Sequence, residues 1–188
     1  MKITTVGRQM EVPRDLKELF EKKIPLKAHA HQANDIFTAI RIAEEFGVTF
    51  ASALSAGGAI PVFAVYSSFL QRAYDQIIHD CAIENLPITL LVDRAGIVGE
   101  DGETHQGVFD ISFLTSVPNV EIFSPTNFYE LEKCIKNSTD NKNVTAIRYP
   151  RGCEAEIVKD MIFDGEYTVI KGNGKKCIIT FGRLFSEA

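Results

Sequence analysis

The apolar run LPITLLV at residues 86–92 constrains the fold more than any other part of this chain. Apart from Thr89 the run is apolar, so it shows no alternation between a buried face and a solvated face. This pattern is typical of a strand in a parallel sheet that has helices on both faces. The segment that follows, DRAGIVGEDGETHQG at residues 93–107, abruptly brings charged side chains and four glycines.

Apolar runs alternate with segments of helical spacing along the rest of the chain. Helices of ten or more residues between strands predict a doubly wound, mostly parallel α/β sheet with helices on both faces. The predicted strands lie at residues 24–30, 57–67, 86–93, 120–124, 143–150, 166–172 and 176–182. The predicted helices lie at 33–47, at 68–85 with Ser67 or Ser68 as the cap, and at 127–138 with Thr126 or Asn127 as the cap.

Charged and aromatic residues follow three of these strands directly. Tyr66 ends one strand, Asp93 and Arg94 end the next, and Tyr149 and Arg151 end a third. In sheets of this class, ligands bind beyond the carboxyl ends of the strands. The sequence therefore predicts a binding site at this edge, with the glycine-rich segment as one of its loops.

Composition favours one globular domain of 188 residues, because 45% of the side chains are hydrophobic. The net charge of -5, without a basic run, argues against nucleic acid or an anionic membrane as the partner. No apolar stretch approaches the roughly 18 residues of a membrane span, and no signal peptide is recognised, so we expect a cytoplasmic protein. The four cysteines are scattered and match neither a zinc cluster nor a redox pair.

Several long stretches resemble one known family. They include IAEEFGVTFASALSAGG, PVFAVYSSFLQRAYDQIIHD, NLPITLLVDRAGIVGEDGETHQGVFDISFL, PNVEIFSPTN and AIRYPRG. From about residue 42 onward the chain resembles the pyrimidine-binding domain of the 1-deoxy-D-xylulose-5-phosphate synthase family, thiamine-diphosphate enzymes of the transketolase group. The resemblance implies a pyrimidine-binding domain at 42–160, and at 161–188 the truncated start of a connection to a missing C-terminal domain.

The resemblance implies a set of cofactor contacts. Glu44 matches the catalytic glutamate that bonds to the aminopyrimidine ring of thiamine diphosphate and promotes loss of its C2 proton. Tyr66 and Phe69 match positions whose rings pack on the pyrimidine, and Arg72 lies in the same motif. Taken without the family match, Glu44 is more typical of the solvated end of an amphipathic helix, and Phe69 is also consistent with helix core and Arg72 with a surface charge.

The resemblance also implies substrate contacts. Arg94 and Arg151 match the arginines that hold the substrate phosphate, for which two guanidinium groups are well suited. Asp101 and His105 match active-site positions, with His105 a catalytic proton-transfer group or a partner of a substrate hydroxyl, and Tyr66 also lies on this side. A loop histidine without such a match is more often simply solvated.

The first forty residues differ from that family. Residues from about 13 to 47 resemble a segment of a metal-dependent amidohydrolase of the imidazolonepropionase type, in which HAH supplies a metal ligand. His29 and His31 lie two apart in the predicted strand, so both could face one metal ion, but the other ligands of such a site are absent. We expect residues 1–41 to form a strand-helix segment joined to the same sheet.

Several functions are consistent with these features. The first is the pyrimidine-binding domain of a synthase of isoprenoid biosynthesis, a transferase that condenses pyruvate with glyceraldehyde 3-phosphate. We expect the chain alone to be inactive, because thiamine diphosphate and magnesium are held mainly by a diphosphate domain that it lacks. A homodimer, or association with that domain, is the expected assembly. The alternatives are a non-catalytic subunit of a split transketolase-type enzyme, an amidohydrolase-related metal-binding protein, and a folded hybrid without function.

Overall fold

The computed structural model describes residues 2–5, 8–11, 47–49, 51–163, 167–170 and 174–188. In the first two of these ranges, β1 (Lys2–Thr5) and β2 (Arg8–Glu11) form an antiparallel pair, which was not predicted from the sequence. The predicted strand at 24–30 and all but the last residue of the predicted helix at 33–47 lie outside the described residues. Helical turns cover residues 47–49 and 51–56.

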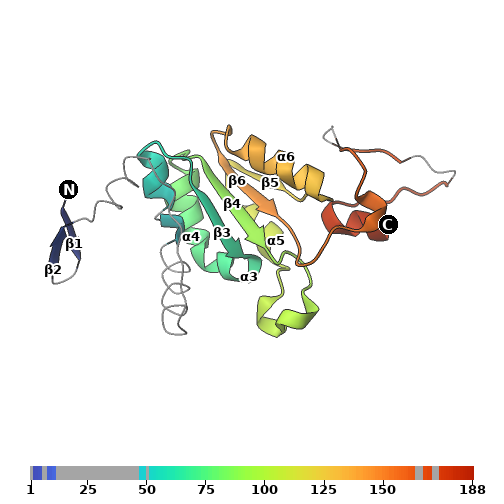
Figure 1. Cartoon of the computed structure of the whole chain (residues 1–188), viewed down its shortest axis with the longest axis horizontal. Helices are drawn as coiled ribbons and strands as arrows, with labels where there is room; N and C mark the ends of the chain where they lie inside the picture. Colours follow the sequence, from blue (N-terminus) through green and yellow to red (C-terminus); the bar gives the residue numbers. More distant parts are fainter. Residues whose placement is uncertain (1, 6–7, 12–46, 50, 164–166, 171–173) are drawn as a thin grey trace.

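A four-stranded parallel sheet forms the centre of the described structure. Its strands are β3 (Val62–Tyr66), β4 (Ile88–Asp93), β6 (Val144–Arg148) and β5 (Val120–Phe123), in that order across the sheet (Figure 1). All three neighbouring pairs are parallel. The four strands match predicted strands, and the predicted doubly wound α/β fold is confirmed. β4 lies at an inner position with most of its side chains buried, as its continuous apolar pattern indicates.

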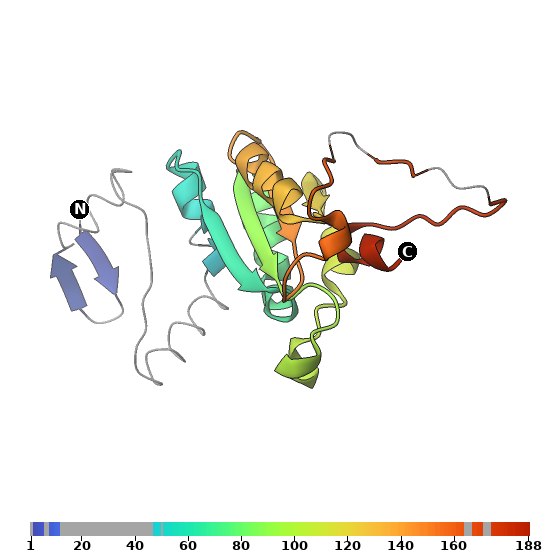
Figure 2. The same ribbon diagram turned by 45° about the vertical axis from the view of Figure 1, so that its right-hand side comes forward.

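Helices cover both faces of this sheet (Figures 1 and 2). One face packs against α5 (Asp110–Leu114) and a longer helical segment formed by α3 (Ser67–Leu70), a 3-10 turn (Gln71–Ala73), α4 (Tyr74–Gln76) and a π-helical turn (Ile77–Ala82). The opposite face is covered by α6 (Phe128–Ser138), where the Thr89 hydroxyl donates to Ser138 Oγ at 3.0 Å. No helix in the described ranges combines the length and apolarity that a membrane crossing requires.

The main hydrophobic core lies between the sheet and the helical segment at 67–82. Ile88, Leu90 and Val92 alternate along β4 and point to this face, where Leu70 and Ile77 are fully buried against them. Complete burial of each such side chain stabilises the fold by about 1.5–3 kcal/mol. The sheet end that carries the predicted site is thus supported by packed apolar side chains.

Helix starts were predicted with mixed success. Asn127 caps α6 as expected, since its side chain accepts from the Glu130 amide at 3.0 Å, and the Glu130 carboxylate accepts from the Thr126 amide at 2.7 Å. The prediction that Ser67 or Ser68 caps the other helix is wrong. Tyr66 precedes the first turn without a side-chain cap, and Ser67 is turned into the structure with only 2% of its surface exposed.

The two strands predicted near the C-terminus are not formed in the described residues. Residues 167–170 and 174–181 belong to no strand of the described ranges, residue 175 is a bend, and Ile179 is 94% exposed. An apolar β pattern becomes a strand only when another strand edge accepts its hydrogen bonds. Short 3-10 turns occur at Glu156–Val158 and Gly182–Glu187, and the Phe163 and Phe185 rings meet edge to face at 5.6 Å.

One buried ion pair joins α5 to the end of β6. Arg148 Nε donates to Asp110 Oδ2 at 2.8 Å, and Nη2 donates to Oδ1 at 3.3 Å. The Asp110 side chain is only 1% exposed. A third bond runs from Arg148 Nη1 to Ser124 Oγ at 3.3 Å. The guanidinium therefore links β6 to α5 and to the residue that follows β5.

Replacing Asp110→Ala is expected to lower the free energy of unfolding by about 3–5 kcal/mol, because Arg148 keeps a buried positive charge without its counter-ion. Equilibrium urea unfolding, followed by circular dichroism, measures this change. Glu132→Ala serves as the control: Glu132 pairs with Lys136 on the exposed side of α6, and its loss should change stability little. Equal stability of the two variants would contradict a structural role for the buried pair.

Candidate functional site

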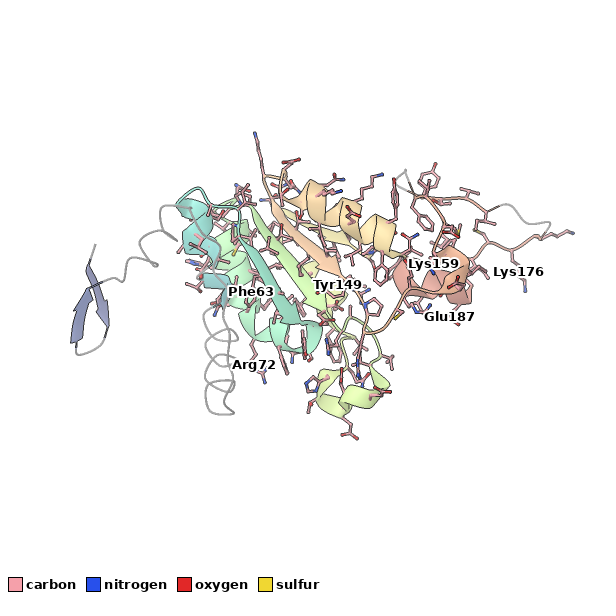
Figure 3. All side chains as sticks on the ribbon, viewed as in Figure 1. Phe63, Arg72, Tyr149, Lys159, Lys176 and Glu187 are labelled. Carbon is pink, nitrogen blue, oxygen red and sulfur yellow. The ribbon has the colours of Figure 1, made fainter. Side chains whose placement is uncertain are left out.

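The strand register brings three chain segments together at one edge of the sheet. Tyr66 at the end of β3 pairs in register with Asp93 of β4, and Val92 pairs with Arg148 of β6. The Tyr149 amide donates to the Val92 carbonyl at 3.0 Å, which extends the ladder by one residue. Figure 3 labels Tyr149 at this edge, from which the yellow-green loop that follows β4 projects in Figure 1. The predicted grouping of these strand ends is thus present in the structure.

Three rings form an aromatic cluster beyond β3. Tyr66 and Phe69 are stacked with centroids 5.5 Å apart and an interplanar angle of 20°. His105 meets both rings edge-on, at 5.8 Å from Tyr66 and 5.2 Å from Phe69. Such pairs stabilise an arrangement by about 0.5–1.5 kcal/mol beyond the burial of their area. The histidine of the glycine-rich loop is therefore held against the first turn of α3.

Two arginines approach the faces of these rings. The Arg94 guanidinium carbon lies 4.1 Å from the Tyr66 ring centroid, and that of Arg72 lies 5.5 Å from the Phe69 centroid. Both distances are within the range of a cation–π interaction. Arg94 reaches its position from a left-handed backbone conformation with φ of 55°, which few residues other than glycine and asparagine adopt readily. That conformation turns the chain out of β4 and over Tyr66.

Acidic side chains link the two arginines that were expected to hold a phosphate. Arg94 Nε donates to Asp101 Oδ2 at 3.0 Å, and Arg151 Nη1 donates to Asp101 Oδ1 at 2.9 Å. Arg94 Nη1 also bonds to Asp93, and Arg151 Nη2 lies 3.0 Å from Glu100 Oε2. Burial opposes the charge of Arg94, but the bonds to Asp101 and Asp93 outweigh it and raise the pKa of the guanidinium.

The glycine-rich loop is closed at its base by backbone hydrogen bonds. Gly96 and Gly107 exchange two N–H···O bonds of 2.7 and 2.8 Å. Inside the loop, the Gln106 side chain accepts from the Val98 amide at 2.8 Å and donates to the Gly102 carbonyl at 3.0 Å. Gln106 therefore sets the shape of the loop that carries Asp101 and His105. This role of Gln106 is not predictable from the sequence, because its partners are backbone atoms that leave no residue pattern.

A cavity of about 280 Å³ is lined in part by Arg94 and by none of the three rings of the aromatic cluster. It extends from Asp93 and Arg94 past Tyr149 and Arg151 to the start of α6. Burial, reinforced by the negative charge of Asp93, raises the pKa of the Tyr149 hydroxyl, which therefore stays protonated at neutral pH. Apolar and charged residues share the cavity wall, among them Pro125, Phe128, Leu131, Glu154 and Arg183. Arg94 is thus the residue common to the ring cluster and the cavity.

The structure places most of the expected site residues in one region. Those that it connects through ring contacts or ion pairs are Tyr66, Phe69, Arg72, Arg94, Asp101, His105 and Arg151. Glu44, His29 and His31 lie outside the described residues, so their expected roles stay predictions. In the described ranges, no group of three or more histidine, cysteine, aspartate or glutamate side chains is arranged to hold a metal ion. Glu100 and Arg183 join the site as residues that the sequence analysis did not name.

Comparison with known proteins adds to this geometry. Residues 19–153 match the family described as "Transketolase, pyrimidine binding domain". The chain belongs to this family. The match begins at residue 19, so residues 19–41 of the predicted N-terminal segment also match the family from which they were expected to differ. The expected domain boundary at residue 42 stays a prediction.

The curated relatives include several 1-deoxy-D-xylulose-5-phosphate synthases. That of Clostridium beijerinckii is 42% identical over 167 residues, which cover 87% of this chain and 27% of the relative. That of Caldanaerobacter subterraneus subsp. tengcongensis is 50% identical over 157 residues, which cover 82% of this chain and 25% of the relative. The chain therefore spans about a quarter of the length of the relatives that it matches. The predicted resemblance to this synthase family is confirmed.

Solved transketolase structures share the fold. A split-gene transketolase, described as an inactive beta4 tetramer, superposes with a TM-score of 0.57 at 25% identity and covers 65% of this chain and 40% of its own. The transketolase from Campylobacter jejuni superposes with a TM-score of 0.53 at 23% identity, over 57% of this chain and 17% of its own. The second likeness extends to the fold alone.

Gly107→Ala tests the close packing at the base of the loop. An added Cβ would lie 2.1 Å from the Arg94 carbonyl oxygen and 2.7 Å from Ser67 Oγ, so the backbone must move. We expect a loss of about 1–3 kcal/mol in the free energy of unfolding and altered NMR signals of the His105 ring. Gly99→Ala is the control, because its Cβ meets no atom within 4 Å. An unchanged His105 spectrum in Gly107→Ala would show that the loop is not held in this way.

Proposed function

We propose that this chain is the pyrimidine-binding part of a thiamine-diphosphate-dependent synthase of the 1-deoxy-D-xylulose-5-phosphate type. The observation that supports it best is the position of Arg94, whose guanidinium covers the Tyr66 ring and shares Asp101 with Arg151. A flat aromatic surface and a pair of cations are thereby joined at one sheet edge. A cofactor ring and an anionic substrate could bind side by side in such a site.

The residues present fit the pyrimidine ring of the cofactor. Phe69 and Tyr66 are half-buried and offer ring faces, and the Ser67 and Ser68 hydroxyls between them are buried without a hydrogen-bond partner in the described residues. Buried polar atoms without partners are rare in proteins, and a ligand is one way of satisfying them. Thiamine diphosphate, when bound, supplies the nucleophilic carbon that attacks a ketoacid carbonyl. In this proposal Phe69 and Tyr66 orient its ring, Arg72 flanks them, and Glu44 holds a proton at the ring.

Arg94 and Arg151 are assigned to a phosphate group of the substrate in the same proposal. Guanidinium groups bind phosphate through parallel N–H···O bonds, and the two arginines stand on connections of adjacent strands. His105 lies next to the rings and on the same loop as Asp101, where it can donate to or accept from a substrate hydroxyl. Pyruvate and glyceraldehyde 3-phosphate are the proposed substrates, and the likeness to the curated synthases supports this assignment.

A second candidate is a subunit of a split transketolase-type enzyme. The likeness to a transketolase of 25% identity favours it, since that protein is described as the product of a split gene. In this case the diphosphate group and magnesium are held by a separately encoded partner. Homodimer formation, a cytoplasmic location and the role of magnesium stay predictions in both cases, and so does a metal site at His29 and His31.

Titration calorimetry with thiamine diphosphate and magnesium tests the proposal, with the chain alone and mixed with a diphosphate-binding domain of a related synthase. We expect binding in the mixture, at least about tenfold tighter than to either component, because each holds only half of the cofactor. Phe69→Ala should weaken that binding about tenfold or more through loss of ring contact. Phe181→Ala removes an exposed aromatic ring outside the site and should leave it unchanged.

Two results would contradict this proposal. One is the absence of heat in the mixture at cofactor concentrations that saturate the complete relatives. The other is equal binding by wild type and Phe69→Ala, which would place the pyrimidine elsewhere. Formation of product from pyruvate and glyceraldehyde 3-phosphate in the mixture but not in the chain alone would identify the reaction and support the expectation that the chain is inactive by itself.

A further inference from the structure

The two arginines assigned to an anionic ligand are already bound by carboxylates of the chain. Asp101 places one oxygen on each guanidinium, with N···O distances of 3.0 Å to Arg94 and 2.9 Å to Arg151. Asp93 completes the surroundings of Arg94, and Glu100 lies 3.0 Å from the second Nη of Arg151. A carboxylate that bridges two guanidinium groups occupies the position that a phosphate group would take.

The charge of this cluster is unfavourable for an incoming anion. The two arginines contribute two positive charges, and Asp93, Glu100 and Asp101 contribute three negative ones. A phosphate group brings up to two further negative charges, and like charges at contact distance repel each other. The arginines can therefore accept a phosphate only after one or more of these carboxylates has moved away.

The two carboxylates at the tip, Glu100 and Asp101, are carried by the loop and not by a strand. The base of the loop is fixed by the paired hydrogen bonds of Gly96 and Gly107. Glu100 and Asp101 form a single 3-10 turn that ends at Gly102, which has a positive φ of 80° and open space on the side where a Cβ would stand. The Glu100 side chain is 85% exposed, so no packing holds it in place. Asp93, by contrast, belongs to β4 and remains with the sheet.

We propose that Asp101, with Glu100, is a carboxylate latch that occupies the anion site and is displaced when a phosphate group binds to Arg94 and Arg151. The inference rests on the proposed function, because it concerns the same arginine pair. It adds that the affinity for the phosphorylated ligand is limited by the chain's own acidic side chains. It also implies that the tip of the loop changes conformation on binding, while its base at Gly96 and Gly107 does not.

If the latch exists, variants in which a carboxylate of the loop tip is replaced by a neutral amide bind phosphate more tightly than the wild-type chain. Asp101→Asn keeps the size of the side chain and removes its charge, and we expect the dissociation constant for inorganic phosphate to fall about 3- to 10-fold. Glu100→Gln should give a smaller fall, because Glu100 is more exposed and touches only one arginine. Glu103→Gln makes the same charge change in the same loop, at an exposed side chain with no described contact to either arginine, and should leave the constant unchanged.

The experiment is a titration of the full chain with inorganic phosphate at constant ionic strength, read out from the arginine side-chain NMR signals. Arg151→Gln is included to show that the measured binding belongs to this site, and thermal unfolding without phosphate shows that each variant is folded. Tighter binding by Asp101→Asn, lost again in the Asp101→Asn/Arg151→Gln double variant, supports the latch. Equal or weaker binding by Asp101→Asn overturns it and makes Asp101 a residue that positions the arginines.

The outcomes separate the latch from the proposed function. If Arg151→Gln abolishes phosphate binding while Asp101→Asn does not strengthen it, the arginines form an anion site and the latch is wrong. If phosphate binds equally to wild type, Arg151→Gln and Asp101→Asn, the arginine pair is not the anion site and both inferences fail. If no variant binds phosphate, then removal of the Asp101 charge does not make the two arginines available to an anion, and the latch is likewise wrong.

Discussion

The parallel register of β3, β4 and β6 is the constraint from which the candidate site follows. Because Tyr66 pairs with Asp93 and Val92 pairs with Arg148, the carboxyl ends of these three strands lie side by side at one edge of the sheet. A shift by one residue would turn Tyr66 and Asp93 to the opposite faces, since side chains alternate along a strand. The register is stabilised by Leu90 and Val92, which are buried against the helical segment at 67–82. Packing on one face thus determines which polar groups meet at the edge.

At that edge, Arg94 connects features that otherwise lie apart. Its backbone turns out of β4 with a positive φ, and its guanidinium covers the Tyr66 ring and bonds to Asp93 and Asp101. The buried Arg148–Asp110 pair joins the end of β6 to α5. Arg148 is therefore a structural residue, whereas Arg94 lies at the candidate site. The positive charge of Arg94 is compensated within the chain by two carboxylates, those of Asp93 and Asp101.

The sequence predicted the central sheet and most of the residues that meet at the candidate site, and the reasons for its errors are physical. The continuous apolar run at 86–92 indicated β4, and the family motif identified Arg94, Asp101 and His105. Which carboxylate meets which arginine could not be predicted, because the contact depends on the folding of the loop around Gln106. The strands predicted at 166–172 and 176–182 were wrong at their described residues, since an apolar pattern does not supply a ladder partner. Ser67 was mistaken for a helix cap because burial under Gly107 is not visible in the sequence.

The central claim is that the ring cluster and Arg94 form one ligand-binding surface, and NMR mapping tests it most directly. The isotope-labelled chain would be titrated with thiamine diphosphate and magnesium in the presence of an unlabelled diphosphate-binding domain. The account predicts that the largest ligand-dependent changes appear in the side-chain signals of Tyr66, Phe69, Arg94 and His105. Ligand-dependent changes confined to the C-terminal residues 174–188, with the Phe69 and His105 rings unaffected, would contradict it.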